Sequence, residues 1–409
     1  MRLKTHPQSS RRRGSRRLAT RTVPRAEATL TGAACAILLL ACGGDKSPTG
    51  APGVSNSCGP LPYFTVLPVA PGDIDAVAVV GGLGAPGHTL PTAQSGILLA
   101  RINVPVLSPG RIQPTQLRRV TYVASPNRQG EIDYALFYGV CRDVDGWFGH
   151  LTTVPGKILE RADFSNCERY NTSIETVESC TSNLSNLTLS AGESMGTGGL
   201  SVELGLVGLD IGLLDQRVNH FYVTRSRYPA GTFHAVCPWE YFDDTNRGIL
   251  LSALRDLGRP GLVPGGEPRC GTMEVDVAGT AKGVWAEVGV TGPLQGDETR
   301  YMTLANYPYR PEEMLALSLG PAALGARVAV VPRATTGRVN RSFEQVTGDG
   351  LMYCYSATDP PDLGRSWLLS LAGGGTLRIE QIEHIGAPGP CVDDPATWSF
   401  GPNAMAFVR

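Results

Sequence analysis

Glycine and proline set the strongest limit on what this chain can fold into. The 409 residues include 50 glycines and 31 prolines. That is about a fifth of the chain, where roughly 12% is usual in soluble domains. Because both residues break helices and mark turns, they divide the chain into short apolar segments. We therefore expect a mainly β protein with few helices, and the length allows two or three domains.

Short apolar runs bounded by turn residues are typical of antiparallel sheet. In the first half they predict strands over 75–80, 96–106, 117–124, 134–140 and 147–153, with a further one over 202–206. In the second half they predict strands over 273–277, 284–290, 301–305, 326–331, 351–355 and 377–382. Helices are expected over 157–164 and 245–257. No fixed-period repeat is visible, which argues against solenoids and propellers.

The first 41 residues differ from the rest of the chain in charge. They hold nine basic residues and one acidic residue, so residues 42–409 carry 27 basic against 36 acidic residues. A nucleic-acid-binding surface needs Lys and Arg to neutralise phosphates, and the acidic remainder has no basic block. The charge pattern therefore argues against a nucleic-acid partner.

An apolar segment over residues 31–42 follows the basic start. It is shorter than the roughly 20 residues of a membrane-spanning helix, and its basic flank is typical of a secretory signal. Its end, Leu39-Leu40-Ala41-Cys42-Gly43, resembles a bacterial lipobox, in which the cysteine is lipidated and becomes the new N-terminus. The resemblance implies a signal peptide over 1–41 and a lipid on Cys42. The alternative is an ordinary signal peptide with an accidental cysteine.

The segment after the lipobox is rich in Gly, Ser and Pro, and it predicts a flexible tether over 42–57. Asp45 does not directly follow Cys42, so the simplest inner-membrane retention signal is missing. We expect the protein in the bacterial cell envelope, held to a membrane by its lipid, with the outer membrane favoured.

Eight further cysteines follow the lipobox: Cys58, Cys141, Cys167, Cys180, Cys237, Cys270, Cys354 and Cys391. An even number in an exported chain favours four disulfides, whose pairing the sequence leaves open. Cys167 and Cys180 bracket a polar stretch, so a local bridge between them is the simplest prediction. No pair has the two-residue spacing of a zinc knuckle, which argues against a thiolate metal site. A lone nucleophilic thiol is the alternative.

Common catalytic motifs are missing from the sequence. There is no Gly-x-Ser-x-Gly elbow, no Walker loop and no His-Glu-x-x-His. The carboxylates of Asp243 and Asp244 are expected to cap the helix that follows, and a glycosidase pair or cation site with Glu240 is the alternative. Of the histidines, His88 follows a Gly-rich strand end and His150 lies in a strand after an apparent hairpin. No catalytic residue is assigned from these patterns alone.

Three segments together resemble the LytM-type (M23) zinc metallopeptidase domain. They are Asp133–Tyr138, Phe148–Leu151 and Ser190–Gly196, and their order and spacing carry the resemblance over roughly residues 75–217. The family places a strand before a Tyr-x-His-Leu segment, then a Gly-containing turn, then a final His-x-His strand. Its zinc is held by the His and Asp of His-x-x-x-Asp and by the second His of His-x-His.

Carried over by position, His88 matches the first zinc ligand and His150 matches the histidine of Tyr-x-His-Leu. Thr92 stands where the family has its aspartate, and the expected His-x-His strand reads as 208–215 without a histidine. Asp210 could donate an oxygen and His220 a nitrogen, although neither falls where the motif demands. The resemblance therefore implies a LytM-like fold whose metal site is degenerate, with no metal confidently assigned.

The resulting prediction is a lipoprotein with two β-rich domains. The expected boundaries are 58–242 for a LytM-like antiparallel β domain, 243–270 for a helical connector and 271–409 for a C-terminal β domain. The leading hypothesis is non-catalytic binding of peptidoglycan or another envelope partner at His88, His150 and Asp210, with no cofactor. The alternative is a zinc-dependent endopeptidase acting on peptidoglycan cross-links, and a third possibility is a purely structural surface protein.

Overall fold

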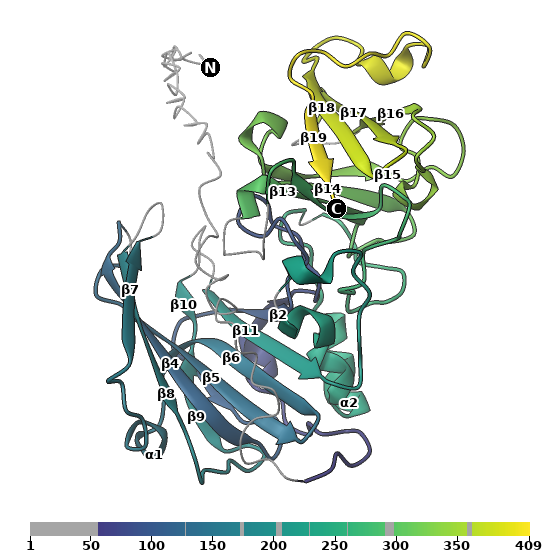
Figure 1. Cartoon of the computed structure of the whole chain (residues 1–409). Helices are drawn as coiled ribbons and strands as arrows, with labels where there is room; N and C mark the ends of the chain where they lie inside the picture. Colours follow the sequence, from purple (N-terminus) through teal and green to yellow (C-terminus); the bar gives the residue numbers. More distant parts are fainter. Residues whose placement is uncertain are drawn as a thin grey trace, which may run out of the picture. The chain divides into compact units, whose positions relative to one another are not determined.

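The computed structural model describes residues 56–126, 128–171, 176–201, 207–228, 230–259, 261–290, 298–357 and 362–409. These residues form a mainly β protein with two antiparallel sheets and few helices (Figure 1), so the predicted fold class is confirmed. The leader, Cys42, most of the tether and the strand expected over 202–206 lie outside the described residues.

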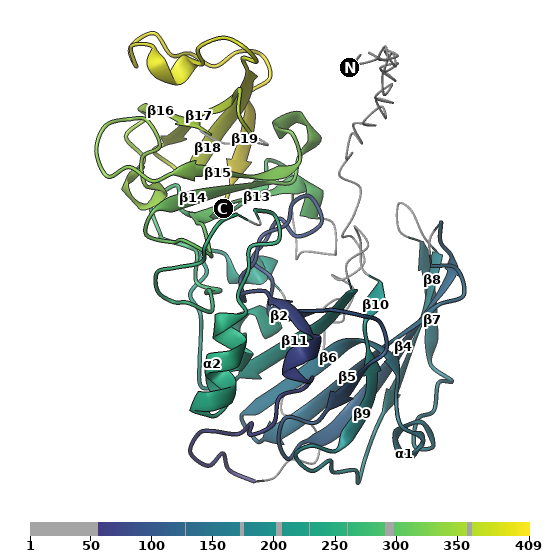
Figure 2. The same cartoon turned by 180° about the vertical axis from the view of Figure 1, so that it is seen from behind.

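The first sheet is built from residues 74–215 and has eleven strands in the described part of the chain. They are β1 (Ile74–Val77), β2 (Gln94–Leu99), β3 (Val104–Leu107), β4 (Gln113–Ala124), β5 (Ile132–Cys141), β6 (Val144–Thr153), β7 (Cys167–Asn171), β8 (Thr176–Asn183), β9 (Ser194–Gly198), β10 (Leu200–Ser201) and β11 (Val207–Asp215). The main order is β1-β2-β11-β6-β5-β4-β8-β7, so β6 lies between β11 and β5 (Figure 2).

The single strand expected over 96–106 is wrong, because β2 and β3 are separate strands. An exposed turn at 100–103 divides them. Asn103 in this turn has a φ of 56°, in the left-handed region that interrupts a strand. The missed boundary thus comes from one asparagine in a conformation that its apolar neighbours do not reveal.

Alternation along the strands gives the first sheet one apolar face. Leu136 of β5, Phe148 of β6 and Leu209 of β11 are buried on it and belong to one core cluster. The opposite face carries Asp210, which pairs across the sheet with Gly149 on one side and Gly96 on the other. This second face presents the polar side chains that concern the functional site.

The second sheet is built from residues 283–408 and has eight strands in the described chain. They are β12 (Gly283–Glu287), β13 (Tyr301–Asn306), β14 (Met314–Leu319), β15 (Arg327–Pro332), β16 (Met352–Ser356), β17 (Arg365–Ala372), β18 (Thr376–Glu383) and β19 (Met405–Val408). Their order is β15-β14-β13-β12-β19-β18-β17-β16. Residues from both ends of this order, Val331 and Tyr355, share one buried cluster with Trp285, so the sheet curls around its own core.

The strand expected over 273–277 does not form. Asp276 instead accepts the backbone amides of Val223 and Val284 through its carboxylate, at 2.8 Å each. Side-chain pairing thus replaces a sheet ladder in this segment.

Helices are short. The α-helices are α1 (Gly156–Leu159) and α2 (Asp244–Ser252), and both end earlier than the sequence predicts. The 3₁₀ helices of the described chain are Pro71–Asp73, Arg225–Arg227, Ala230–His234, Pro238–Tyr241, Glu298–Arg300 (η7), Ala322–Leu324, Phe343–Gln345 and Pro390–Val392. Asp243 caps α2 as predicted, because its Oδ1 accepts the Asn246 amide at 2.9 Å. No helix in the described ranges has the length and apolar character needed to span a bilayer.

All eight cysteines after the lipobox are paired, which confirms the prediction of four disulfides. The bridges are Cys58–Cys141, Cys167–Cys180, Cys237–Cys270 and Cys354–Cys391. The local bridge between Cys167 and Cys180 joins directly paired residues of β7 and β8. The two sheets lie on either side of the predicted connector in sequence, and the exact domain boundaries stay a prediction.

Candidate functional site

A β-bulge places His150 on the polar face of the first sheet. Tyr134 pairs with Leu151 and Leu136 pairs with Phe148, so β6 has one more residue than β5 between these pairs. His150 lies in this bulge. Its φ is 62°, a left-handed conformation that non-glycine residues seldom adopt. The bulge thereby brings its imidazole between two aspartates of the neighbouring strands.

The two aspartates flank the ring of His150 from opposite sides. Nδ1 lies 2.9 Å from Oδ2 of Asp133, and Nε2 lies 3.2 Å from Oδ2 of Asp210. The first contact is a hydrogen bond, and the second is an ion-pair contact. The His150 side chain is 6% exposed, and those of Asp133 and Asp210 are 13% and 17% exposed. The cluster is therefore largely withdrawn from water.

Electrostatics favour the charged form of His150. Burial by itself lowers its pKa, but Asp133 and Asp210 outweigh burial and hold the pKa of His150 well above its usual 6.5. Both ring nitrogens then carry protons. The cluster is a buried imidazolium between two carboxylates, with a net charge of about −1 when both aspartates are ionised.

Gln94 extends the cluster along β2. Its Nε2 donates to Oδ2 of Asp210 at 2.9 Å, so this carboxylate oxygen faces both an amide and the imidazolium. Oδ1 of Asp133 is buried without a hydrogen-bond partner. Buried polar atoms with unmet bonding capacity are uncommon and mark places where water, an ion or a ligand can complete the structure.

His88 approaches from the loop between β1 and β2. Two backbone hydrogen bonds close a tight turn, one from the Gly84 amide to the His88 carbonyl and one from the His88 amide to the Gly84 carbonyl, at 2.7 and 2.9 Å. Burial lowers the pKa of His88, and the negative charge of Asp210 opposes that shift. His88 is therefore a neutral imidazole at pH 7 within electrostatic range of Asp210.

The structure places two of the three residues that the sequence singled out in direct contact, His150 and Asp210. For His88 it shows an electrostatic effect of Asp210 on the pKa. His150 lies on β6, an interior strand between β11 and β5, and not at an edge of the sheet. His220 lies apart from this cluster, because its Nε2 hydrogen-bonds to the carbonyl of Ala235.

Asp133 and Gln94 are site residues that sequence reasoning missed. Asp133 begins the apolar segment used in the comparison with LytM-type domains, and alternation along β5 puts it on the face opposite Leu136. Its contact with His150 depends on the bulge in β6, which no residue pattern announces. Gln94 reaches Asp210 only because β2 pairs with β11 across a long sequence interval.

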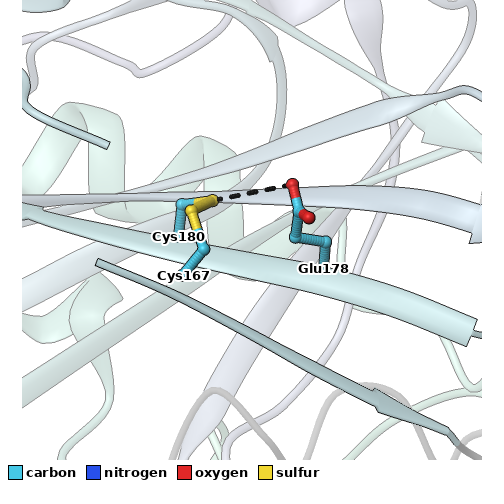
Figure 3. Close-up of side chains that lie close together, drawn as sticks. All are labelled: Cys167, Glu178 and Cys180. Atoms are coloured by element: carbon cyan, nitrogen blue, oxygen red, sulfur yellow. Dashed lines mark hydrogen bonds between the residues drawn. A yellow bond between two sulfur atoms is a disulfide. The ribbon is translucent and has the colours of Figure 1, made fainter. Parts of the chain in front are cut away.

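Few side chains of the described residues are placed so that they could share a metal ion. In the described chain, one group of three His, Cys, Asp or Glu residues has its ligand atoms within 4.8 Å of one another, and it comprises Cys167, Glu178 and Cys180. Figure 3 shows that the two sulfurs of this group form a disulfide beside the carboxylate. A sulfur in a disulfide is not a thiolate and is therefore a poor metal ligand. It also carries no proton, so the 3.9 Å contact between Cys180 and Glu178 is not a hydrogen bond.

In the part of the chain that the structure describes, His88, His150 and Asp210 do not form such a group. The side chains as placed do not fit the three-ligand zinc site of a peptidase.

A second buried acid, Asp145, lies on the same strand as His150. It is 7% exposed, and its Oδ2 has no hydrogen-bond partner. Burial raises its pKa to about 7, against the opposing effect of a hydrogen bond from Gln216. Within the described residues no ion pair involves this carboxyl, so burial raises the pKa of Asp145, whereas neighbouring charges raise that of His150.

Comparisons with known proteins add little. No family model matches the chain, and no curated protein matches it. Among solved structures, the NMR solution structure of lysostaphin is weakly similar, with a TM-score of 0.22 and 9% identity over 85% of this chain and 91% of that chain. A TM-score this low carries no argument about function, which has to be inferred from the side chains.

The two histidines of the site are expected to titrate on opposite sides of 6.5. In an NMR titration, the His150 ring should stay protonated at pH 7, and the His88 ring should lose its proton below pH 6.5. Asp133→Asn should lower the pKa of His150, because one of the two opposing carboxylates is removed. A common midpoint near 6.5 for both rings, unchanged in the variant, would contradict the buried ion cluster.

Asp145 is expected to make the protein less stable as the pH rises. Its unfolded carboxyl ionises near pH 4, while the folded one stays protonated until about pH 7, so stability falls across that window. Asp145→Asn should raise the free energy of unfolding at pH 8 by up to about 4 kcal/mol and leave it unchanged below pH 4. Urea denaturation at both pH values measures this, and an equal difference at both would refute it.

Proposed function

We propose that the polar face around His150 is a non-catalytic binding site for peptidoglycan or another cell-envelope partner. The observation that carries the proposal is the imidazolium of His150 held between Asp133 and Asp210. The ligand class comes from the sequence resemblance to LytM-type domains, and the side-chain geometry bears on whether the site binds or cleaves.

The charge state of His150 argues against a role as a general base. A general base must accept a proton, and an imidazolium with both nitrogens protonated cannot do so. Nδ1 is moreover taken up by the hydrogen bond with Asp133. Thr92, which stands in place of the family's aspartate, uses its hydroxyl to donate to the carbonyl of Gln94. The groups that would activate water are thus engaged in holding the site together.

The same groups are suited to binding a peptide. The aspartates are acceptors for amide N–H or ammonium groups, and Oδ1 of Asp133 has no hydrogen-bond partner within the protein. Stem peptides of peptidoglycan offer amide donors, carbonyl acceptors and free amines. A ligand of this kind would complete hydrogen bonds that the protein leaves open, which favours binding.

The alternative function is a zinc-dependent endopeptidase with His88 as a ligand and His150 as an assisting residue. One observation favours it, because His88 is a neutral imidazole near the carboxylate of Asp210. This reading requires His150 to give up a proton and the three side chains to move closer together. The metal content of the purified protein distinguishes the two functions.

We further propose that the site acts at a membrane surface. Under this proposal Cys42 carries the lipid of a bacterial lipoprotein, favoured in the outer membrane, and residues 42–57 serve as the tether. A single lipid chain gives only marginal binding, whereas several acyl chains hold a protein stably. The four disulfides agree with an oxidising compartment outside the cytoplasm.

Wall binding without metal is the expected outcome for residues 43–409 purified from an oxidising compartment. The protein should cosediment with purified peptidoglycan sacculi and carry no zinc by native mass spectrometry. His150→Gln should weaken cosedimentation by roughly tenfold, as expected for the loss of a charged hydrogen-bonding group. The matched control is His234→Gln, since His234 bonds the carbonyl of Val218 outside the site.

Other results would assign a different function. One zinc per chain that disappears in a His88→Ala, His150→Ala double variant would identify the endopeptidase instead. Neither zinc nor wall binding would leave a structural role.

Lipid attachment is tested with metabolic labelling. Cells fed radiolabelled palmitate should label the full-length protein, and Cys42→Ala should abolish the label because the acceptor sulfur is lost. Cys35→Ala is the matched control, since Cys35 lies in the same leader and should leave labelling intact. Equal labelling of the parent and the Cys42 variant would rule out the anchor.

A further inference from the structure

The loop that carries His88 is attached to the second β region by a buried hydrogen bond. The amide of Leu90 donates to Oε2 of Glu298 at 2.7 Å, across 208 residues of sequence. Leu90 is 5% exposed and Glu298 is 3% exposed, so water does not compete for the bond. Glu298 begins η7, which leads directly into β13.

Apolar packing reinforces this attachment. Leu90 belongs to a buried cluster with Tyr301 and Ala305 of β13, together with Tyr222 and Phe233. The cluster draws on both β regions and on the segment between them. The position of the loop thus depends on residues of the second region as well as on its own sequence.

Hydrogen bonds within the loop define its shape, so the attachment of Leu90 determines where His88 lies. Backbone bonds join Gly84 with His88 and Gly81 with Thr92, and the hydroxyl of Thr89 donates to the carbonyl of Pro86 at 3.2 Å. These bonds fix the shape of the loop. The bond from Leu90, two residues after His88, fixes how the loop is directed towards the sheet that bears Asp210.

The bond to Glu298 is buried at both of its ends. Its acceptor is a carboxyl oxygen 2.7 Å from the amide, and breaking a buried hydrogen bond leaves the donor unsatisfied. If the carboxylate is removed, the Leu90 amide loses its partner in a place where water cannot replace it. An unpaired buried amide raises the free energy of the present loop position, and this favours a displaced loop.

We propose that Glu298 is a positioning residue of the binding site: it holds the His88 loop, which leads into β2 and its Gln94–Asp210 bond, and so makes the second β region part of the site. The inference rests on the proposed binding function, although Glu298 itself need not contact the ligand. It also implies coupling, because whatever loosens η7 weakens binding at the first sheet, and a ligand at the first sheet in turn stabilises the attachment.

The test uses the chain from residue 43 onward and compares Glu298→Ala with Glu298→Gln. In the alanine variant, hydrogen exchange of the Leu90 amide should quicken by about tenfold or more, as expected for the loss of a buried hydrogen bond. The NMR signal of the His88 ring should shift, and cosedimentation with sacculi should weaken. The glutamine variant keeps a carbonyl acceptor and should restore all three measurements towards those of the parent.

Glu380→Ala is the matched control for general destabilisation. Glu380 is a buried carboxyl group that accepts the backbone amide of Gly401, and both partners belong to the second region. This variant should lower the melting temperature without changing Leu90 exchange or the His88 signal. If it changes them as much as Glu298→Ala does, the effect is one of overall stability and the positioning role is refuted.

Two outcomes separate this inference from the proposed function. Unchanged Leu90 exchange and an unchanged His88 signal in Glu298→Ala would overturn the positioning role, even if the parent binds sacculi. If the parent does not bind sacculi, the proposed function fails, while a shifted His88 signal rescued by Glu298→Gln would still support positioning of the loop.

Discussion

The pairing of β6 with β5 and β11 is the constraint on which the site depends. Because β6 lies inside the sheet, its neighbours supply one aspartate from each side, Asp133 from β5 and Asp210 from β11. Close packing maintains this arrangement. A Cβ on Gly212 would lie 2.0 Å from the indole of Trp147, and a Cβ on Gly149 would press on Asp210 at 3.3 Å. Small residues therefore let the strands carry bulky and charged groups on one face.

Asp145 and His150 show how compensation decides the charge state of a buried group. Both lie on β6 and both are less than a tenth exposed. Burial disfavours the charge of each, but only His150 has opposite charges in contact, so it stays protonated while Asp145 stays neutral up to about pH 7. The strand thus holds a proton on each group, for opposite reasons. The contrast shows that the two carboxylates keep His150 protonated, since burial alone would have favoured the neutral ring.

Sequence reasoning predicted the parts of this structure that local chemistry determines. Turn residues and alternation indicated the β class, the even cysteine count indicated four bridges, and Asp243 was expected to cap a helix. The convergence of Asp133, Gln94 and Asp210 on His150 could not be predicted, because it depends on strand register over long intervals and on one bulge. The resemblance selected His88 and His150 by order along the chain, and it had no means of finding Glu298 in a distant segment.

The attachment of the His88 loop differs in kind from the four disulfides. Two of the four disulfides lie within residues 58–180, one joins Cys237 to Cys270, and one lies within the second region. None of the four links the first sheet to the second, so the bond between Leu90 and Glu298 and the apolar cluster around it do this without a covalent bridge. A non-covalent attachment can open and close at equilibrium. A site that includes it can therefore respond to the second region, which a disulfide at this place would prevent.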